Sequence, residues 1–233
     1  MESTQVAIVI PAYNESQTIK CVIDELKEEL IGHNFEVIVV NDCSTDDTSD
    51  IATATGAKVI NLTRNYGYSG AIEQGFNYVT TRDFDYVLTM DADGQHHPSS
   101  VKKIIECLEQ QKPKMVIGDR GEYARLGEWL YGKVFERLLG IKDPLCGLKA
   151  YAVDAYREIG FFESFDSIGS ELSVRMLNKE AHYCCSPVII RNRKGEARFG
   201  NGLKVELRLI KSLYKSISFI TKNFKKTERQ NSI

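Results

Sequence analysis

The chain of 233 residues is 42% hydrophobic and 27% charged, and its formal net charge is −2. These values are ordinary for a soluble globular protein, and the length suits one sizeable α/β domain or a domain with an appendage. They give no support for general nucleic-acid binding, because no basic patch lies outside the C-terminal segment.

The N-terminus and the cysteines favour a cytoplasmic protein. Residues 1–5 are polar, and the apolar run at 6–10 is too short for a signal peptide. No apolar run approaches the roughly 20 residues that a membrane-spanning helix needs. The six cysteines lack CxxC spacing and form no ligand cluster with the four histidines. We therefore expect reduced thiols and no structural zinc site.

Short β-type runs alternate with amphipathic helical stretches through the first half of the chain. In chain order, the pattern predicts strands at 6–11, 35–40, 58–62, 86–90 and 115–117. It predicts the intervening helices at 15–30, 48–55, 69–79 and 99–109. This order is typical of a mostly parallel sheet with right-handed crossovers. The sequence therefore predicts an α/β fold with a mostly parallel central sheet flanked by helices.

Carboxylates follow three of the predicted strands, in the loops at 11–15, 41–44 and 91–95. Ligands of open α/β sheets bind beyond the carboxyl ends of the strands, so we expect these loops to form one site. No GxGxxG follows the first strand and no GxxxxGK[ST] is present, which disfavours a dinucleotide dehydrogenase and a P-loop enzyme. Phosphate would then be held through a metal ion rather than by a glycine-rich loop.

Asp91, Asp93 and Gln95 follow the fourth predicted strand with a spacing of two residues. In an extended chain this spacing places the three side chains on one side. Hard oxygen ligands at a strand end suit Mg²⁺ or Mn²⁺, which bind through one or two carboxylates and substrate phosphates. The alternative is an Asx-rich turn with Gly94 and Pro98 as turn residues. The neighbouring carboxylate loops favour the metal site.

Apolar residues recur at intervals of three and four near the C-terminus, at Leu203, Leu207, Ile210, Tyr214, Ile217, Ile220 and Phe224. This spacing predicts an amphipathic helix. Eight Lys or Arg against two Glu give residues 204–229 a charge of +6, which leaves −8 for the remainder. We expect a basic amphipathic helix and tail at 201–233 after a domain at 1–200. The helix either packs on the sheet or lies in a membrane interface.

Six motifs follow one another along most of the chain. They are VIPAYNE at 9–15, VVNDCSTD at 39–46, NYG at 65–67, MDADGQHHP at 90–98, GDR at 118–120 and DPLCGLKAY at 143–151. Their order resembles that of the family 2 glycosyltransferases, inverting enzymes with the GT-A nucleotide-sugar fold. Within the family they are most similar to the dolichyl-phosphate mannosyltransferase, or polyprenyl-phosphate glycosyltransferase, group. The resemblance covers about residues 5–200.

The resemblance implies roles for the matching residues. The nucleotide-sugar pocket would be formed by Pro11, Tyr13, Glu15, Asp42, Asp91 and Ala92. The metal, Mg²⁺ or Mn²⁺, would be bound by Asp91, Asp93 and Gln95. Asp93 and Arg120 would be catalytic. The cations available to hold an acceptor phosphate include Arg120, Arg137, Lys149 and Arg198.

Two positions depart from the family pattern. The usual Asp-Asp-Gly-Ser has an amide at Asn41, and the usual Gly-Phe-Arg ends in Lys149. The second change replaces a bidentate guanidinium by a point charge. The identities of the sugar and the base therefore stay open.

Several candidates also have a purely structural interpretation. Glu15 could favour the dipole of a helix as a first-turn carboxylate. Asp42 could belong to an Asx turn or a helix cap, and Arg120 could be a solvated surface residue. The carboxylates available as a catalytic base are Asp143, Asp166 and Glu171.

The sequence predicts a metal-dependent inverting glycosyltransferase that moves a hexose from a nucleotide sugar to a polyprenyl phosphate. The donor would be GDP-mannose or a UDP-hexose, and the enzyme would lie peripherally on the cytoplasmic face of a membrane. A partner copy or a membrane-protein partner is left open. The alternatives are a family 2 enzyme with a sugar-hydroxyl acceptor in surface polysaccharide or glycolipid assembly, a nucleotidyltransferase and a nucleotide-sugar sensor. A sugar hydroxyl needs a base during attack, whereas a lipid phosphate is already anionic.

Overall fold

The computed structural model describes residues 4–123, 125–165, 167–191 and 203–230, with only the backbone of 203, 204 and 224–230. Its strands are β1 (Gln5–Ala12), β2 (Asn34–Asn41), β3 (Lys58–Asn61), β4 (Tyr86–Thr89), β5 (Met115–Asp119), β6 (Lys149–Ala152) and β7 (Tyr183–Pro187). Its helices are α1 (Ile19–Glu29), α2 (Thr48–Ala54), α3 (Gly67–Thr80), α4 (Pro98–Gln111), α5 (Leu126–Leu139), α6 (Val153–Ile159), α7 (Ser170–Leu177) and α8 (Leu203–Gln230).

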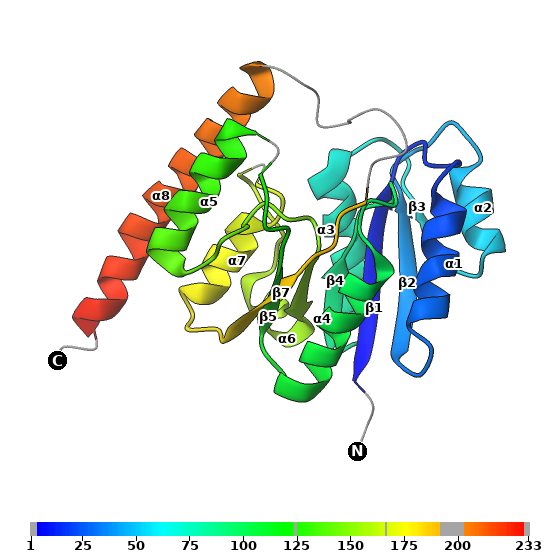
Figure 1. The fold of residues 1–233 in the computed structure, drawn as a ribbon, viewed down its shortest axis with the longest axis horizontal. Coiled ribbons are helices and arrows are strands. Elements are labelled where there is room, and N and C mark those ends of the chain that lie inside the picture. The colour runs from blue at the N-terminus through cyan, green and yellow to red at the C-terminus, as the bar shows by residue number, and fades with distance from the viewer. Residues whose placement is uncertain (1–3, 124, 166, 192–202, 231–233) are drawn as a thin grey trace.

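The strands form one sheet in the order β3-β2-β1-β4-β6-β5-β7 (Figure 1). Strand β6 runs antiparallel to β4 and β5, and the other pairs are parallel. The prediction of a mostly parallel sheet is therefore confirmed. All predicted strands and helices of the first half are present, with ends shifted by up to four residues.

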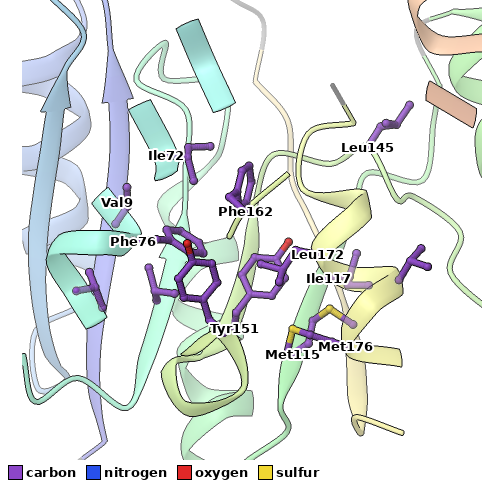
Figure 2. Packing of buried hydrophobic residues seen from close by; sticks show 14 of the residues in the cluster. Val9, Ile72, Phe76, Met115, Ile117, Leu145, Tyr151, Phe162, Leu172 and Met176 are labelled. Atoms are coloured by element: carbon purple, nitrogen blue, oxygen red, sulfur yellow. The ribbon is translucent and has the colours of Figure 1, made fainter. Parts of the chain in front are cut away.

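Two hydrophobic clusters cover the two faces of the sheet. Alternate residues of β1 divide between them, because successive side chains of a strand point to opposite faces. Val6, Ile8 and Ile10 pack with α1 and α4, whereas Ala7 and Val9 pack with α3. On the α3 face, the Phe76 ring lies edge-on to neighbouring rings in the packing of Figure 2, 6.0 Å from Tyr151 and 5.2 Å from Phe162.

Helix α8 lies beside α5 and also contacts α7 (Figure 1). Its packed side consists of Val205, Leu209, Ser212, Leu213, Ser216 and Ile220. Two polar contacts join it to α5: Gly127 N donates to Glu206 Oε2 over 2.8 Å, and the Tyr131 and Ser216 hydroxyls lie 2.9 Å apart.

The apolar stripe that the sequence spacing singled out is mostly not the packed side of α8. Leu207, Ile210 and Tyr214 are exposed. The helix carries apolar residues along a second stripe, and that stripe contacts the rest of the protein. Among the stripe positions whose side chains are described, Ile220 is buried and Ile217 is partly buried against the core.

Candidate active site

A cavity of about 520 Å³ opens beyond the carboxyl ends of β1 and β4. Its walls come from the end of β1, the loops after β1, β4, β5 and β7, the segments before β6 and α7, the start of α3 and α5, and one residue of α8. The lining residues are Pro11, Glu15, Tyr68, Asp91, Ala92, Asp93, Gln95, His96, Arg120, Glu122, Tyr123, Arg125, Glu128, Leu145, Gly147, Ile168, Ile190 and Leu209. Two of the three predicted carboxylate loops thus meet here, whereas the loop at 41–44 contributes no lining residue.

Asp91 is held in a narrow space at the end of β4. The backbone N–H of Asp91 donates to His96 Nδ1 over 3.4 Å, and His96 Nε2 lies 3.9 Å from Asp91 Oδ2. A Cβ at Gly147 would lie 2.9 Å from Oδ2 and 3.1 Å from Oδ1, so only glycine leaves this carboxylate its room. Burial, with the charge and hydrogen bonding of Asp91, raises the pKa of the Tyr68 hydroxyl well above its usual range.

One oxygen of Asp91, Oδ1, is buried and has no hydrogen-bond partner among the described residues. Such an oxygen is costly unless a cation or a donor reaches it. Asp93 and Gln95 line the same cavity, and Gln95 N donates to Asp93 Oδ1 over 3.0 Å across the turn at Gly94. The loop is therefore an Asx turn, and the turn also brings the two carboxylates to one cavity.

The chemistry of this loop fits a divalent cation. Within the described part of the chain, no three His, Cys, Asp or Glu side chains gather as a closed metal site. The carboxylates of Asp91 and Asp93 and the amide oxygen of Gln95 are hard oxygen donors, the ligand type that Mg²⁺ and Mn²⁺ prefer.

Arg120 directly follows β5 and lines the same cavity. It contacts two acidic side chains, Asp143 and Glu128. Its Nε and one terminal nitrogen donate to the two oxygens of Asp143 over 2.6 and 2.9 Å. Glu128 Oε2 lies 3.5 Å from the same terminal nitrogen. Burial acts to lower the pKa of the Arg120 guanidinium, but the hydrogen bonds and charge of Asp143 outweigh it and raise that pKa. Arg120 is thus a positioned, permanently charged group rather than a solvated surface residue.

The remaining nucleotide-pocket candidates divide between the cavity and its surroundings. Pro11, Glu15 and Ala92 line the cavity, whereas Tyr13 is 40% exposed and contributes no lining. Because α1 begins at Ile19, Glu15 precedes the helix and the first-turn interpretation is wrong. Its Oε2 accepts a hydrogen bond of 2.6 Å from the Thr18 hydroxyl.

Asp42 is buried next to the start of α3. Its two carboxylate oxygens accept hydrogen bonds from the backbone N–H groups of Tyr66 and Gly67, over 2.7 and 2.9 Å. These N–H groups lie at the helix N-terminus, where an anion is favoured. Asp42 therefore fixes the beginning of the helix that carries Tyr68.

The other candidate phosphate ligands lie off the cavity or outside the described residues. Lys149 is 1% exposed, and its ammonium donates to the carbonyls of Pro144 and Ile168 over 2.7 and 2.5 Å. Burial lowers its pKa to about 8. Arg137 is exposed near the end of α5 and does not line the cavity. Arg198 lies outside the described residues.

The two candidate bases that the structure describes, Asp143 and Glu171, do not line the cavity. Asp143 is committed to Arg120, and Glu171 is fully buried, where it accepts from Ser164 N and from the Arg175 guanidinium over 2.5 and 2.7 Å. Asp166 lies outside the described residues. Neither described candidate is therefore placed to take a proton from a ligand in this cavity.

Some cavity residues were not singled out from the sequence, notably Tyr68, Glu128 and Ile168. Ile168 has a φ of 54°, which is strained for a β-branched side chain. Its carbonyl is held by Lys149, and Glu163 Oε2 accepts from the N–H groups on either side, those of Ser167 and Gly169. Tyr68 directly follows the NYG motif at 65–67, whereas no local pattern marks Glu128 or Ile168.

A solved structure confirms the class of fold. A glucosyl-3-phosphoglycerate synthase from Mycobacterium tuberculosis, in complex with Mn²⁺, UDP and phosphoglyceric acid, aligns with a TM-score of 0.71 at 21% identity, over 91% of this chain and 78% of that one. A second structure of that synthase contains Mg²⁺ and UDP. The chain thus has a GT-A fold.

Sequence comparison then identifies the family. The model of glycosyl transferase family 2 matches residues 7–145, more than half of the chain. The chain belongs to this family and is a glycosyltransferase. An undecaprenyl-phosphate mannosyltransferase of Micrococcus luteus is 28% identical over 76% of this chain and 78% of that protein. A dolichol-phosphate mannosyltransferase of Pyrococcus furiosus is 30% identical over 63% of this chain and 46% of that protein.

Proposed function

We propose that the protein is a metal-dependent inverting transferase that moves a hexose from a nucleotide sugar to a polyprenyl phosphate. The observation that carries this proposal is the composition of one cavity. Its lining includes the carboxylates of Asp91 and Asp93 and the guanidinium groups of Arg120 and Arg125. Asp91 Oδ1 is buried without a hydrogen-bond partner among the described residues. The two carboxylates would hold a divalent cation together with a diphosphate, and the two arginines would hold a second phosphate.

Asp91 and Asp93, with Gln95 beside them, would hold Mg²⁺ or Mn²⁺ in this proposal. The cation supplies Lewis-acid stabilisation of the nucleoside diphosphate as it leaves. Gly147 leaves space for the Asp91 carboxylate, and Tyr68 orients it. Pro11, Glu15 and Ala92 line the part of the cavity next to this loop and would contact the nucleotide sugar. Asp42 would act on the same pocket by fixing the start of α3, and Tyr13, on the same loop as Glu15, would contact the base.

The surroundings of the two candidate bases that the structure describes favour a phosphate acceptor. Asp143 and Glu171 are both committed to arginines, so neither is free to take a proton from a sugar hydroxyl. A lipid phosphate needs no such base, because it is already anionic near neutral pH. Arg120, kept charged and held by Asp143, would position that phosphate for in-line attack at the anomeric carbon. The relatives named above carry polyprenyl-phosphate acceptors in their names, in agreement with this choice.

The exposed side chains of α5 and α8 support a peripheral membrane location. Large apolar residues are exposed on both helices, which lie side by side (Figure 1): Leu126, Trp129, Leu130, Leu138, Leu207, Ile210 and Tyr214. Exposed basic residues accompany them, at Lys133, Arg137, Arg208, Lys211 and Lys222. Such a combination suits the interface of an anionic bilayer.

The two helices also reach the cavity. Glu128 of α5 and Leu209 of α8 are lining residues, so a lipid acceptor bound at this surface would have its phosphate near Arg120. Among the described helices, none has the length and apolar character needed to cross a bilayer. From the exposed apolar and basic residues of α5 and α8 we propose that the protein lies on the cytoplasmic surface of a membrane and receives its acceptor there.

Incubation with radiolabelled nucleotide sugars, Mn²⁺ and a polyprenyl phosphate tests the function. We expect an acid-labile glycolipid and release of nucleoside diphosphate, with chelation by EDTA abolishing both. A labelled product formed only with a sugar acceptor would favour the alternative of polysaccharide or glycolipid assembly. Release of pyrophosphate would indicate a nucleotidyltransferase and contradict the proposal.

A further inference from the structure

Arg120 contacts two carboxylates that differ in how firmly they hold it. Asp143 accepts two side-chain hydrogen bonds of 2.6 and 2.9 Å and a third of 3.1 Å from the backbone N–H of Arg120. Glu128 reaches the guanidinium only at 3.5 Å. The first pair has the bidentate geometry of a strong charge-assisted interaction, and the second does not. Asp143 therefore fixes Arg120, whereas Glu128 is a weakly held partner.

Glu128 lies between two arginines of the cavity. Its Oε1 accepts a hydrogen bond of 3.0 Å from Arg125, and its Oε2 is buried with no hydrogen-bond partner among the described residues. The side chain is only 8% exposed. A buried carboxylate with one oxygen unsatisfied is costly, so an anion that makes better hydrogen bonds with both arginines would displace it.

We propose that Glu128 is an internal substitute for the acceptor phosphate: it occupies the position between Arg120 and Arg125 in the free enzyme and leaves it when a phosphate monoester enters. This inference rests on the proposed acceptor class. Both guanidinium groups can donate bidentate hydrogen bonds to a phosphate, which matches their geometry better than one carboxylate oxygen does.

The charges around Glu128 agree with its replacement by a phosphate. The four side chains Arg120, Arg125, Asp143 and Glu128 carry two positive and two negative charges, so these four together are neutral. A phosphate monoester carries a charge of about −1.5 to −2 near pH 7. Departure of Glu128 leaves Arg120, Arg125 and Asp143 with one net positive charge for the incoming phosphate. Competition with Glu128 would also exclude anions that bind more weakly than a phosphate does.

The donor also carries phosphate, so the test has to distinguish the two sources. The experiment titrates geranyl phosphate without metal, and UDP or GDP with Mn²⁺, into the full chain. The fluorescence of Trp129 reports binding, because it is the single tryptophan of the chain and follows Glu128 in α5. Calorimetry repeats each titration, in case a substitution alters the tryptophan signal.

Three variants separate the possibilities. Glu128→Gln keeps the shape of the side chain and removes its charge, and Arg125→Gln removes one proposed phosphate ligand. Glu136→Gln is the matched control, because Glu136 lies on the same helix and pairs with Lys133 over 2.8 Å at the surface. We expect Glu128→Gln to bind geranyl phosphate about tenfold more tightly and Arg125→Gln about tenfold more weakly, the scale of one charge-assisted hydrogen bond. Glu136→Gln should bind like the wild type.

Unchanged or weaker binding of geranyl phosphate by Glu128→Gln would overturn the proposal, and so would unchanged binding by Arg125→Gln. If Glu128→Gln instead tightens only the binding of nucleoside diphosphate, the arginines serve the donor and the proposal is wrong. These titrations measure no turnover. A failure to transfer sugar to a lipid would therefore refute the proposed function without changing the result for Glu128.

Discussion

The Lys149 ammonium holds the carbonyl of Ile168, a β-branched residue in the left-handed region of backbone conformation. The same ammonium binds the carbonyl of Pro144, so one buried charge joins two segments that border the cavity. Ile168 itself lines that cavity. The lysine that departs from the family's Gly-Phe-Arg pattern thus has a structural function in this protein, and any role in phosphate binding would act through these segments.

The buried Lys149 predicts a specific dependence of stability on pH. Burial lowers its pKa from 10.5 to about 8 in the folded protein. Between these values the unfolded chain binds the proton and the folded chain does not. The contribution of Lys149 to the free energy of unfolding should therefore rise with pH from about 8 to 10.5, by at most about 1.4 kcal/mol per unit.

Other buried groups act in the opposite direction at high pH. Burial raises the pKa of the Cys146 thiol to about 12, so its contribution to stability falls once the unfolded thiol ionises near pH 9. The measurement is therefore the difference in urea stability between wild type and Lys149→Met across pH 7–10. A difference that does not change with pH would contradict the prediction.

Asp93→Asn should abolish transfer and leave the fold intact. The substitution removes one of two carboxylates of the proposed metal site, so Mn²⁺ and diphosphate should weaken together. Turnover at saturating donor and Mn²⁺, with circular dichroism as the control for folding, checks this. Unchanged turnover with an unchanged dependence on Mn²⁺ would refute the metal assignment.

Gly147→Ala tests the space around Asp91 without touching a proposed ligand. The added Cβ would come within 2.9 Å of Asp91 Oδ2, which forces the carboxylate to move. We expect weaker Mn²⁺ binding and a melting temperature close to that of the wild type. Mn²⁺ affinity, measured by electron paramagnetic resonance, is the readout, and an unaltered affinity would show that Asp91 is not held in position by this contact.

Asp42→Ala should affect both stability and donor binding. The loss of two hydrogen bonds at the start of α3 should cost about 1–2 kcal/mol of unfolding free energy, the usual range for a helix N-cap. Movement of Tyr68 should raise the KM of the donor more than it lowers kcat. Asp42→Asn keeps one acceptor oxygen and should recover part of both effects. A collapse of kcat with unaltered donor affinity would assign Asp42 a different role.

The membrane proposal predicts that exposed apolar residues of α8 contribute to vesicle binding. Leu207→Ser with Tyr214→Ser should weaken co-sedimentation with anionic vesicles and slow transfer to long-chain lipid acceptors. Transfer to geranyl phosphate should change much less. Truncation before α8 is a poorer test, because Val205 and Leu209 are buried against the body of the protein.

Ile31→Ser is the matched control for this experiment. Ile31 is 80% exposed, just after α1, and lies on neither α5 nor α8. Its replacement should leave vesicle binding as it is. High salt should weaken the binding of the wild type, since part of the attraction is electrostatic. A wild-type chain that stays in the supernatant at low salt would contradict the proposal.

The sequence by itself determined the order of strands and helices in the first half and the loop of Asp91, Asp93 and Gln95. These features depend on local patterns: short apolar runs, helical spacing and polar residues directly after a strand. The family followed from the same motifs, because their order is specific even where single motifs are weak.

Only the tertiary structure decided which distant residues meet. Strand β6 is Lys-Ala-Tyr-Ala, which contains a lysine and two weak strand formers, so no apolar run marks it or its reversed direction. The pairing of Arg120 with Asp143 spans 23 positions and depends on that reversal. Helix α8 carries two apolar stripes, and its period alone does not tell which one packs. Burial and ion pairing are properties of the assembled chain, and they distinguish the ligands of the cavity from residues such as Lys149 that support it.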